Sequence, residues 1–274
     1  MITYSQNRFW IYWPLVWTVL FAIIMWTGSV DTDTVYDPGT VKLIPSLENT
    51  WYYAFILAAS IIFPFLLSFD KNVHFYTRWA PLFKATGIVA VFFIIWDIVF
   101  TAVGVWGFND AYILGFKFAG LPIEEWLWFF IIPYCCIFIY ECLNFYIKKD
   151  PLLSIQHYIT WILIPTFLVI GLYSWGQLYT SLTFLSAAGI TFYHHFFHAP
   201  EERSRFFLAW IVSIIPFYLV NGALTGAFTN EAIVVYAPSE FTGIRWGTIP
   251  IDDAIYLYVF LLWIITIYEG FKKK

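Results

Sequence analysis

The chain has 274 residues, of which 61% are hydrophobic and only 12% are charged. An ordinary soluble domain carries about twice that share of charge, so the composition excludes a soluble enzyme and predicts an all-α membrane protein. The net charge of −4 gives no basic surface for a nucleic acid, and we expect the lipid bilayer, not a nucleic acid, as the partner.

Long apolar runs follow one another along the whole chain. A helix needs about 20 apolar residues to cross the hydrocarbon region. This criterion predicts about eight spans, near 9–27, 51–69, 81–104, 122–146, 154–174, 179–196, 206–227 and 250–271. Only Arg8 precedes the first run and no small-residue cleavage site is evident, so we interpret this run as a transmembrane helix and not as a signal peptide.

The eight spans divide into two sets of four. We therefore predict two membrane repeats, over residues 1–150 and 151–274, and an even number of spans makes them parallel. Eleven Lys and Arg residues fall on the side of the two termini and three on the other. The positive-inside rule then predicts cytoplasmic termini in a multi-pass protein of the cell (inner) membrane.

An acidic motif recurs where each half enters its last span. Residues 115–125 match residues 243–253 without a gap, and each copy leads into an apolar run that ends in Tyr-Glu. Pro122 and Pro250 suit the first turn of a helix. The acids that follow would then lie in that first turn, where the helix dipole favours negative charge.

The repeated acids are Glu124, Glu125, Asp252 and Asp253. They could be ordinary acidic helix starts, but carboxylates beside a bilayer are costly, and their repetition favours a function. Adjacent helical residues point about 100° apart. Only one acid of each pair can therefore face a shared cavity, and the sequence leaves open which one. Glu141 and Glu269, in the two Tyr-Glu ends, are predicted to be structural and to lie at the opposite face of the membrane.

Polar residues within the spans strengthen the functional interpretation. Asp97 and Asn221 stand at corresponding places in the third and seventh spans, towards the same side as the acidic pairs. Intramembrane polar groups of this kind usually face a cavity or a partner. Lys117 and Arg245 stand at equivalent positions of the repeat, and we expect them to hold one carboxylate of each pair ionised.

Aromatic residues are abundant, with 15 Trp, 19 Tyr and 30 Phe. An interfacial belt accounts for most of them. Those near the acids could instead line a dry cavity and stabilise a cation through their ring faces. The candidates for such a lining are Trp96, Trp106, Phe118, Trp128 and Trp246.

Motifs for cofactors are missing. The sequence has neither a dinucleotide fingerprint nor a P-loop. His194, His195 and His198 resemble one metal box of a membrane hydroxylase, but the chain has only five His. A membrane di-iron site needs more imidazoles, so we interpret this cluster as interfacial and expect neither a metal nor a cofactor.

Taken together, these stretches resemble the membrane-integral lycopene cyclases, in the form that fuses two repeats in one chain. The resemblance is carried by 96–97, 104–108 and 120–125 in the first half and by 221–226 and 243–253 in the second. The second pair is Asp-Asp, where family members often have Glu-Asp, so one acid is shorter by a methylene.

The resemblance implies a lycopene β-cyclase, an isomerase that closes rings at the ends of linear lycopene without a cofactor. Glu124 or Glu125, with Asp252 or Asp253, would supply the acid and the base, and Asp97 would relay the proton. Two alternatives stay open. One is a cyclase that makes ε rings or uses C50 carotenoids, and the other is a carrier of lipid or protons that changes no product.

Overall fold

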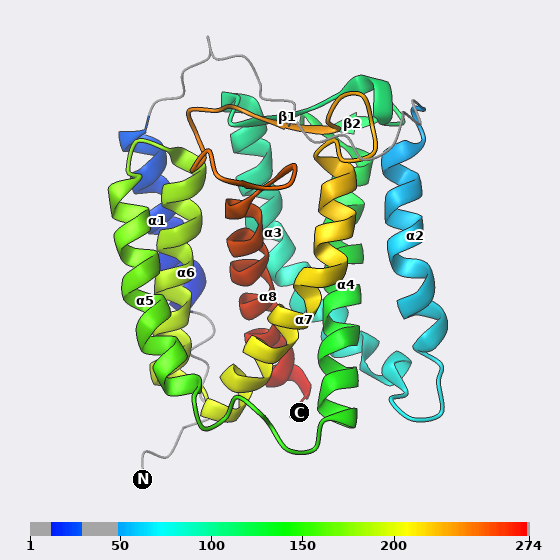
Figure 1. The fold of residues 1–274 in the computed structure, drawn as a ribbon, viewed down its shortest axis with the longest axis vertical. Helices are drawn as coiled ribbons and strands as arrows, with labels where there is room; N and C mark the ends of the chain where they lie inside the picture. Colours follow the sequence, from blue (N-terminus) through cyan, green and yellow to red (C-terminus); the bar gives the residue numbers. More distant parts are fainter. Residues whose placement is uncertain (1–11, 29–48, 273–274) are drawn as a thin grey trace.

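The structure is a computed structural model and describes residues 12–28 and 49–272. Within these ranges eight α-helices stand side by side and alternate in direction along the chain (Figure 1). Their bounds are α1 Tyr12–Thr27, α2 Tyr52–Leu67, α3 Trp79–Val103, α4 Ile123–Tyr146, α5 Gln156–Tyr173, α6 Leu178–Phe197, α7 Pro200–Leu224 and α8 Ile251–Lys272. The predicted all-α architecture is confirmed, and α1 to α4 run in the same directions as α5 to α8.

Five of the described helices are long and apolar enough to cross a membrane, namely α3 with the 3-10 turn Phe75–Arg78 before it, α4, α5, α7 and α8. The helices α1 and α2 are apolar but have 16 residues each. The helix α6 is rich in Ser and Thr, and most of its residues are buried. A helix enclosed by protein does not need the lipid-facing side chains that an outer helix presents.

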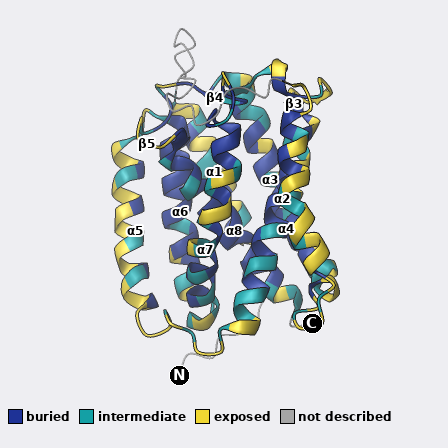
Figure 2. Ribbon diagram, turned by 45° about the vertical axis from the view of Figure 1, so that its right-hand side comes forward, coloured by how far each residue is buried: buried dark blue, intermediate teal, exposed yellow. Residues whose placement is uncertain are grey.

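The helix α8 forms the centre of the molecule. Every residue from Tyr256 to Tyr268 is buried, as expected for a helix that is apolar all round. Around it, α3 and α6 pack on α8, α4 packs on α2, α3 and α7, and α5 packs on α6. Figure 2 shows the buried residues gathered in the middle and the exposed ones on the outer faces of helices such as α5.

The helix α1 interlocks the two halves of the chain. It packs mainly against α6 of the second half. The indole of Trp17 lies 5.9 Å from that of Trp263 in α8 and 5.6 Å from that of Trp96 in α3, between ring centroids. Gly189 of α6 lies directly against Trp13. The helix that begins the first half therefore contributes to the packing of the second.

One helix began earlier than expected. The apolar run predicted a start near 206, but α7 begins at Pro200. Proline suits the first helical position because its missing N–H leaves no donor unpaired. Glu201 and Glu202 then occupy the first turn, where the helix dipole favours acids. These signals extend the helix beyond its apolar part.

The sequence analysis did not predict the short strands at one end of the bundle. β1 (Trp106–Phe108) pairs antiparallel with β4 (Val234–Tyr236) and so joins the two halves. β2 (Lys117–Phe118) and β3 (Leu121–Pro122) form one hairpin, and β5 (Arg245–Trp246) and β6 (Ile249–Pro250) form its counterpart.

These two hairpins are the structural form of the repeated motif. Ala119 and Gly120 have φ of 51° and 85°, as the two central residues of a type I′ turn require, and Gly247 has φ of 67°. The prediction that the prolines lie in the first helical turn was wrong. Pro122 caps α4 in an extended conformation, and Pro250 ends β6.

Basic residues gather at the end of the bundle remote from the strands. The connections from α2 to α3, from α4 to α5 and from α6 to α7 lie at this end, as does the last turn of α8 (Figure 1). These segments carry Lys71, Arg78, Lys148, Lys149, Arg203, Arg205 and Lys272, whereas the strand end carries Lys117 and Arg245. That the basic end faces the cytoplasm stays a prediction.

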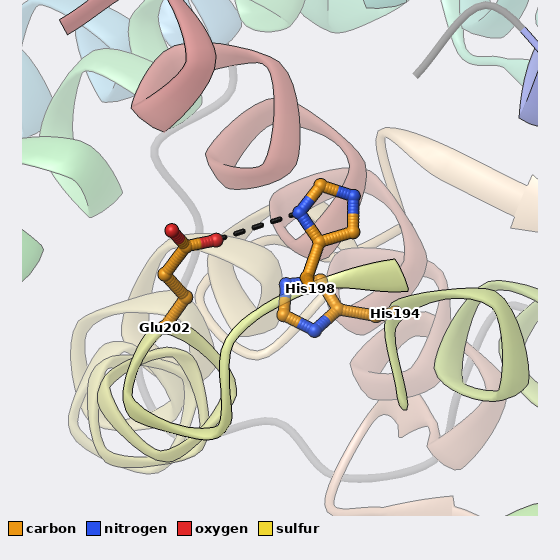
Figure 3. A group of neighbouring side chains, drawn as sticks. All are labelled: His194, His198 and Glu202. Atoms are coloured by element: carbon orange, nitrogen blue, oxygen red, sulfur yellow. Dashed lines mark ion pairs between the residues drawn. The ribbon is translucent and has the colours of Figure 1, made fainter. Parts of the chain in front are cut away.

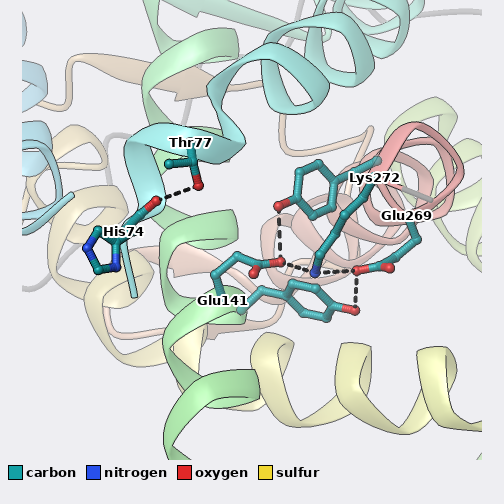
Figure 4. Close-up of polar contacts among 7 residues, drawn as sticks. His74, Thr77, Glu141, Glu269 and Lys272 are labelled. Carbon is teal, nitrogen blue, oxygen red and sulfur yellow. Dashed lines mark hydrogen bonds and ion pairs between the residues drawn. The ribbon is translucent and has the colours of Figure 1, made fainter. Parts of the chain in front are cut away.

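The two Tyr-Glu pairs meet at the basic end (Figure 4). The Tyr140 hydroxyl donates to Glu269 Oε1 at 3.0 Å, and the Tyr268 hydroxyl donates to Glu141 Oε1 at 3.0 Å. Lys272 Nζ lies 2.6 Å from Glu141 Oε1 and 3.3 Å from Glu269 Oε1. These reciprocal hydrogen bonds connect α4 to α8 near the C-terminal ends of both helices. The acidic pairs lie in the first turns of the same helices, at the opposite end of the bundle.

Candidate active site

A cavity lies at the strand end of the bundle. Residues of both halves line it: Tyr53, Asp97, Trp106, Phe108, Glu125, Trp128, Tyr179, Phe217, Asn221, Leu224, Val234, Tyr236, Asp253 and Tyr256. Predicted polar groups of both halves, namely Asp97, Glu125, Asn221 and Asp253, therefore share one cavity. Apart from three carboxylates, an amide and the phenol groups, the lining is aromatic and aliphatic.

Asp97 is buried in α3, with 2% of its surface exposed. Its Oδ1 accepts a hydrogen bond from Trp106 Nε1 at 2.5 Å and a longer one from Thr101 Oγ1 at 3.5 Å. The strand pairing of β1 with β4 fixes the backbone of Trp106. Oδ2 of Asp97 is buried and has no hydrogen-bond partner among the described residues. It is a polar group that substrate or water could meet.

The two acids of the first pair face different surroundings. Glu125 lines the cavity, and its Oε2 accepts a hydrogen bond from the Tyr53 hydroxyl at 2.5 Å. Glu124 is fully buried outside the cavity lining, and its Oε1 accepts a hydrogen bond from the Leu114 amide at 2.7 Å. Glu124 therefore anchors the loop that leads into the β2–β3 hairpin, while Glu125 is available to a ligand.

The second pair divides in the same way. Asp252 accepts hydrogen bonds from the hydroxyls of Thr180 at 2.6 Å and Thr242 at 2.7 Å, so it ties α6 and the preceding loop to the start of α8. Asp253 lines the cavity. The sequence left open which acid of each pair faces the cavity, and the structure places Glu125 and Asp253 there.

Asp253 accepts three hydrogen bonds. Tyr179 donates to its Oδ1 at 2.6 Å, while Asn221 Nδ2 and the Tyr236 hydroxyl donate to its Oδ2 at 2.6 and 2.9 Å. Burial, and then the charge of Asp253, raise the pKa of the Tyr236 phenol well above its usual range, so the phenol remains a donor. Three donors therefore hold this carboxylate in one orientation.

The two halves contribute related groups to the cavity. A tyrosine near the start of α2 bonds Glu125, and a tyrosine near the start of α6 bonds Asp253. Trp106, which bonds Asp97, stands directly opposite Tyr236 in the β1–β4 ladder. The sets are not identical, because Asp97 of α3 is a carboxylic acid and Asn221 of α7 is an amide. This difference makes the site asymmetric.

Neither expected cation lines the cavity, although the Arg245 guanidinium lies 5.9 Å from the ring centroid of Tyr236, which does. Lys117 Nζ forms an ion pair with Asp110 Oδ1 at 2.6 Å on the exposed hairpin. Arg245 donates to the carbonyl oxygen of Thr248, and its guanidinium lies 4.9 Å from the ring centroid of Phe241. The partner expected for Lys117, a carboxylate of the acidic pair, is replaced by Asp110 because the hairpin carries the lysine to the surface.

The predicted aromatic residues divide into three groups. Trp106 and Trp128 line the cavity. Trp96 is buried behind it, with its ring centroid 4.9 Å from that of Tyr256. Phe118 and Trp246 lie on the hairpins, 66% and 57% exposed, and do not line the cavity.

Several lining residues escaped the sequence analysis, chiefly Tyr53, Tyr179, Phe217 and Tyr236. The two tyrosines at the starts of α2 and α6 could have been found by extending the internal repeat towards the N-terminal side of each half. Tyr236 could not, because it comes from a strand that the apolar pattern did not predict.

Comparison with known proteins identifies one family. The family model described as Lycopene cyclase matches residues 49–143 and 176–271, which together make up more than half of the chain. The two matches begin just before α2 and α6, and each ends within the last helix of its half. Neither the curated proteins nor the solved structures include a match. The chain belongs to the lycopene cyclase family.

Proposed function

We propose that the protein is a lycopene β-cyclase of the cell (inner) membrane, an intramolecular lyase that converts the linear ends of lycopene into β-ionone rings. As a family member the chain is a carotenoid cyclase. The observation that carries the finer proposal is the meeting of Asp97, Glu125 and Asp253 in one cavity with aromatic walls. Such a cavity suits proton-initiated chemistry on an apolar, electron-rich substrate.

The reaction begins with a proton. Three carboxylates in one cavity of low polarity do not all ionise together, because like charges repel and burial disfavours charge. Asp253 accepts three hydrogen bonds, which suit a carboxylate anion. We therefore propose that Asp97 and Glu125 are the protonated carboxyl groups of the cavity. We assign Glu125 as the general acid that protonates the terminal double bond, and Asp97 as its neighbouring proton reservoir.

Protonation leaves a tertiary carbocation, which the internal double bond attacks to close a six-membered ring. The new bond moves the positive charge into the ring. The aromatic side chains of Trp106, Trp128 and Tyr256 line the same cavity, and aromatic rings stabilise a cation through their π electrons. Asp253 then removes a ring proton and restores a double bond. The product is an isomer of the substrate, and no electron donor or acceptor is needed.

Site size and the position of the base bear on the product. A cavity lined by fourteen residues is too small to enclose a linear C40 polyene, so we propose that one end group enters at a time and that γ-carotene precedes β-carotene. Loss of the proton from different ring carbons gives a β or an ε ring. Because three hydrogen bonds hold Asp253 in place, we expect it to remove the same ring proton each time and to give a single ring type. We propose that this type is the β ring.

The test is expression of the full chain in a bacterium that accumulates lycopene, followed by chromatography of the extracted pigments. We expect γ-carotene early and β-carotene late. Formation of ε-carotene would overturn the ring type and keep the cyclase. Unchanged lycopene in cells whose membranes contain the folded protein would contradict the lycopene assignment, and supply of C50 carotenoids to the same cells would then separate a cyclase of longer substrates from a carrier.

A further inference from the structure

Three side chains that can bind a metal ion meet (Figure 3) where α6 connects to α7, at the end of the bundle remote from the strands (Figure 1). They are His194, His198 and Glu202. One ligand atom from each lies within 4.8 Å of the ligand atoms of the other two. The group is separate from the acids that we assign to cyclisation.

The turn between α6 and α7 brings these side chains together. His194 lies in the last turn of α6, His198 caps that helix in an extended conformation, and Glu202 lies in the first turn of α7. The carbonyl oxygen of His194 accepts from the His198 amide at 3.1 Å and from Arg203 Nη1 at 3.2 Å. The backbone that presents the imidazoles is therefore fixed on both sides of the turn.

The side chains face one another across this turn. The two imidazole rings are stacked, with centroids 4.6 Å apart and planes at 23°. Glu202 Oε2 lies 3.4 Å from Nδ1 of His198, and Figure 3 shows the carboxylate directed at that ring. The positive charge of the nearby Arg203 guanidinium would repel a divalent cation, and the carboxylate of Glu202 supplies the negative charge that offsets it. Nε of Arg203 donates a hydrogen bond to Gln156 Oε1 at 2.9 Å.

His194 indicates that the cluster binds a ligand. Its side chain is fully buried, and neither ring nitrogen has a hydrogen-bond partner among the described residues. Nε2 of His198 and Nδ1 of His195 are also buried without a hydrogen-bond partner among the described residues. Leaving a buried polar group without a partner carries a free-energy cost. A metal ion would bond to such nitrogens directly and would offset that cost.

We propose that His194, His198 and Glu202 bind one divalent transition-metal ion of the zinc class, which clamps the end of α6 to the start of α7. Imidazole nitrogen and carboxylate oxygen are zinc ligands, at about 2.0–2.2 Å, and three protein ligands leave one position for water. Ligand atoms of a tetrahedral site lie roughly 3.4 Å apart, and the in-plane lone pairs of two stacked imidazoles do not meet at one point, so ion binding requires rotation of at least one ring. This proposal replaces the interfacial interpretation of these histidines drawn from the sequence.

The test measures metal binding by the full-length protein purified in detergent and stripped with a chelator. Zn²⁺ is titrated against a chromophoric competitor, and Co²⁺ is used as a spectroscopic probe of the ligand geometry. We expect one equivalent to bind. The variants His198→Ala and Glu202→Gln should bind Zn²⁺ at least about tenfold more weakly, since even indirect supports of a metal site contribute that much.

His195→Ala is the matched control. Its ring lies on the same helical turn but packs against Trp161 and His157, at 5.2 and 5.7 Å between centroids. We expect its zinc affinity to be unchanged. Zn²⁺ should also raise the thermal midpoint of the wild type and of this control, because a ligand that binds only the folded state stabilises it.

Absence of stoichiometric Zn²⁺ binding by the folded wild type would overturn the proposal. An equal loss of affinity in His195→Ala would do the same, because it would show adventitious binding by surface imidazoles. If His198→Ala does not fold, Glu202→Gln carries the comparison, since it keeps the size of the side chain and changes only the charge and one ligand atom.

Discussion

Glu124 and Glu125 are neighbours in the sequence, but their carboxylates lie in different surroundings. One accepts a backbone amide of the hairpin loop and the other accepts a tyrosine hydroxyl at the cavity. Asp252 and Asp253 repeat the division. Because adjacent helical residues point about 100° apart, a pair of acids at a helix start can hold a loop and serve a site together.

Replacing the cavity acid of the first pair should stop proton transfer. We expect Glu125→Gln to lower the rate of cyclisation by roughly 10²–10⁴-fold, the usual contribution of a general acid. Glu124→Gln keeps an oxygen that can accept the Leu114 amide and should stay close to wild type. Pigment conversion is measured at equal membrane abundance. A Glu124→Gln variant that loses as much as Glu125→Gln would contradict the division of roles.

Tyr236 provides a milder probe of the proposed base. Tyr236→Phe removes one of the three hydrogen bonds to Asp253. We expect cyclisation to slow by roughly tenfold, which corresponds to about 1.4 kcal/mol, near the upper end for one hydrogen bond. Tyr173→Phe is the control, since Tyr173 is 92% exposed on α5. If both variants convert lycopene at the wild-type rate, the hydrogen bond of Tyr236 does not support catalysis.

At the scale of the elements, the apolar pattern predicted all eight helices, because hydrocarbon selects for long apolar runs. It placed the end of α1 at Thr27 and the start of α4 within a residue. It missed the strands, since two- and three-residue ladders carry no periodicity. It also could not place α1, because packing against α6 depends on small contacts such as that of Gly189 with Trp13.

The packing of α1 can be tested at that contact. A β-carbon on Gly189 would lie 2.8 Å from the Trp13 ring, so Gly189→Ala should force α1 to shift and should lower stability by about 1–3 kcal/mol, as overpacking does. Gly87→Ala is the control, because no atom lies within 4 Å of its added carbon. Thermal unfolding in detergent is the measurement. Equal midpoints for both variants would contradict the α1–α6 contact.

At the scale of the whole molecule, the cavity that we propose as the active site is lined by both halves. Tyr53, Asp97 and Glu125 come from the first half and Asn221 and Asp253 from the second. The sequence indicated both sets and placed them at one membrane depth. It could not show that they share a cavity, because the lateral arrangement of helices depends on side-chain packing rather than on hydropathy.

Splitting the chain tests this shared site. We expect fragments 1–150 and 151–274, produced together, to cyclise lycopene, because α1, β1 and α4 make extensive contacts with the second half. Either fragment alone should be inactive. The matched control pairs fragment 151–274 with a first fragment that carries Glu125→Gln, and this pair should assemble without activity. Cyclisation by a single fragment would show that each half has its own site.

Tyr140 donates a hydrogen bond to Glu269, and Tyr268 donates one to Glu141. This pattern has the form of an isologous interface, in which the same pair of residue types makes the same contact twice, once in each direction. Within one chain such reciprocity has no symmetry to enforce it. It is the contact that a single ancestral repeat would have made with its own copy in a homodimer. Gene duplication and fusion would have preserved that contact, while the cavity at the other end was free to diverge into unequal acid and base.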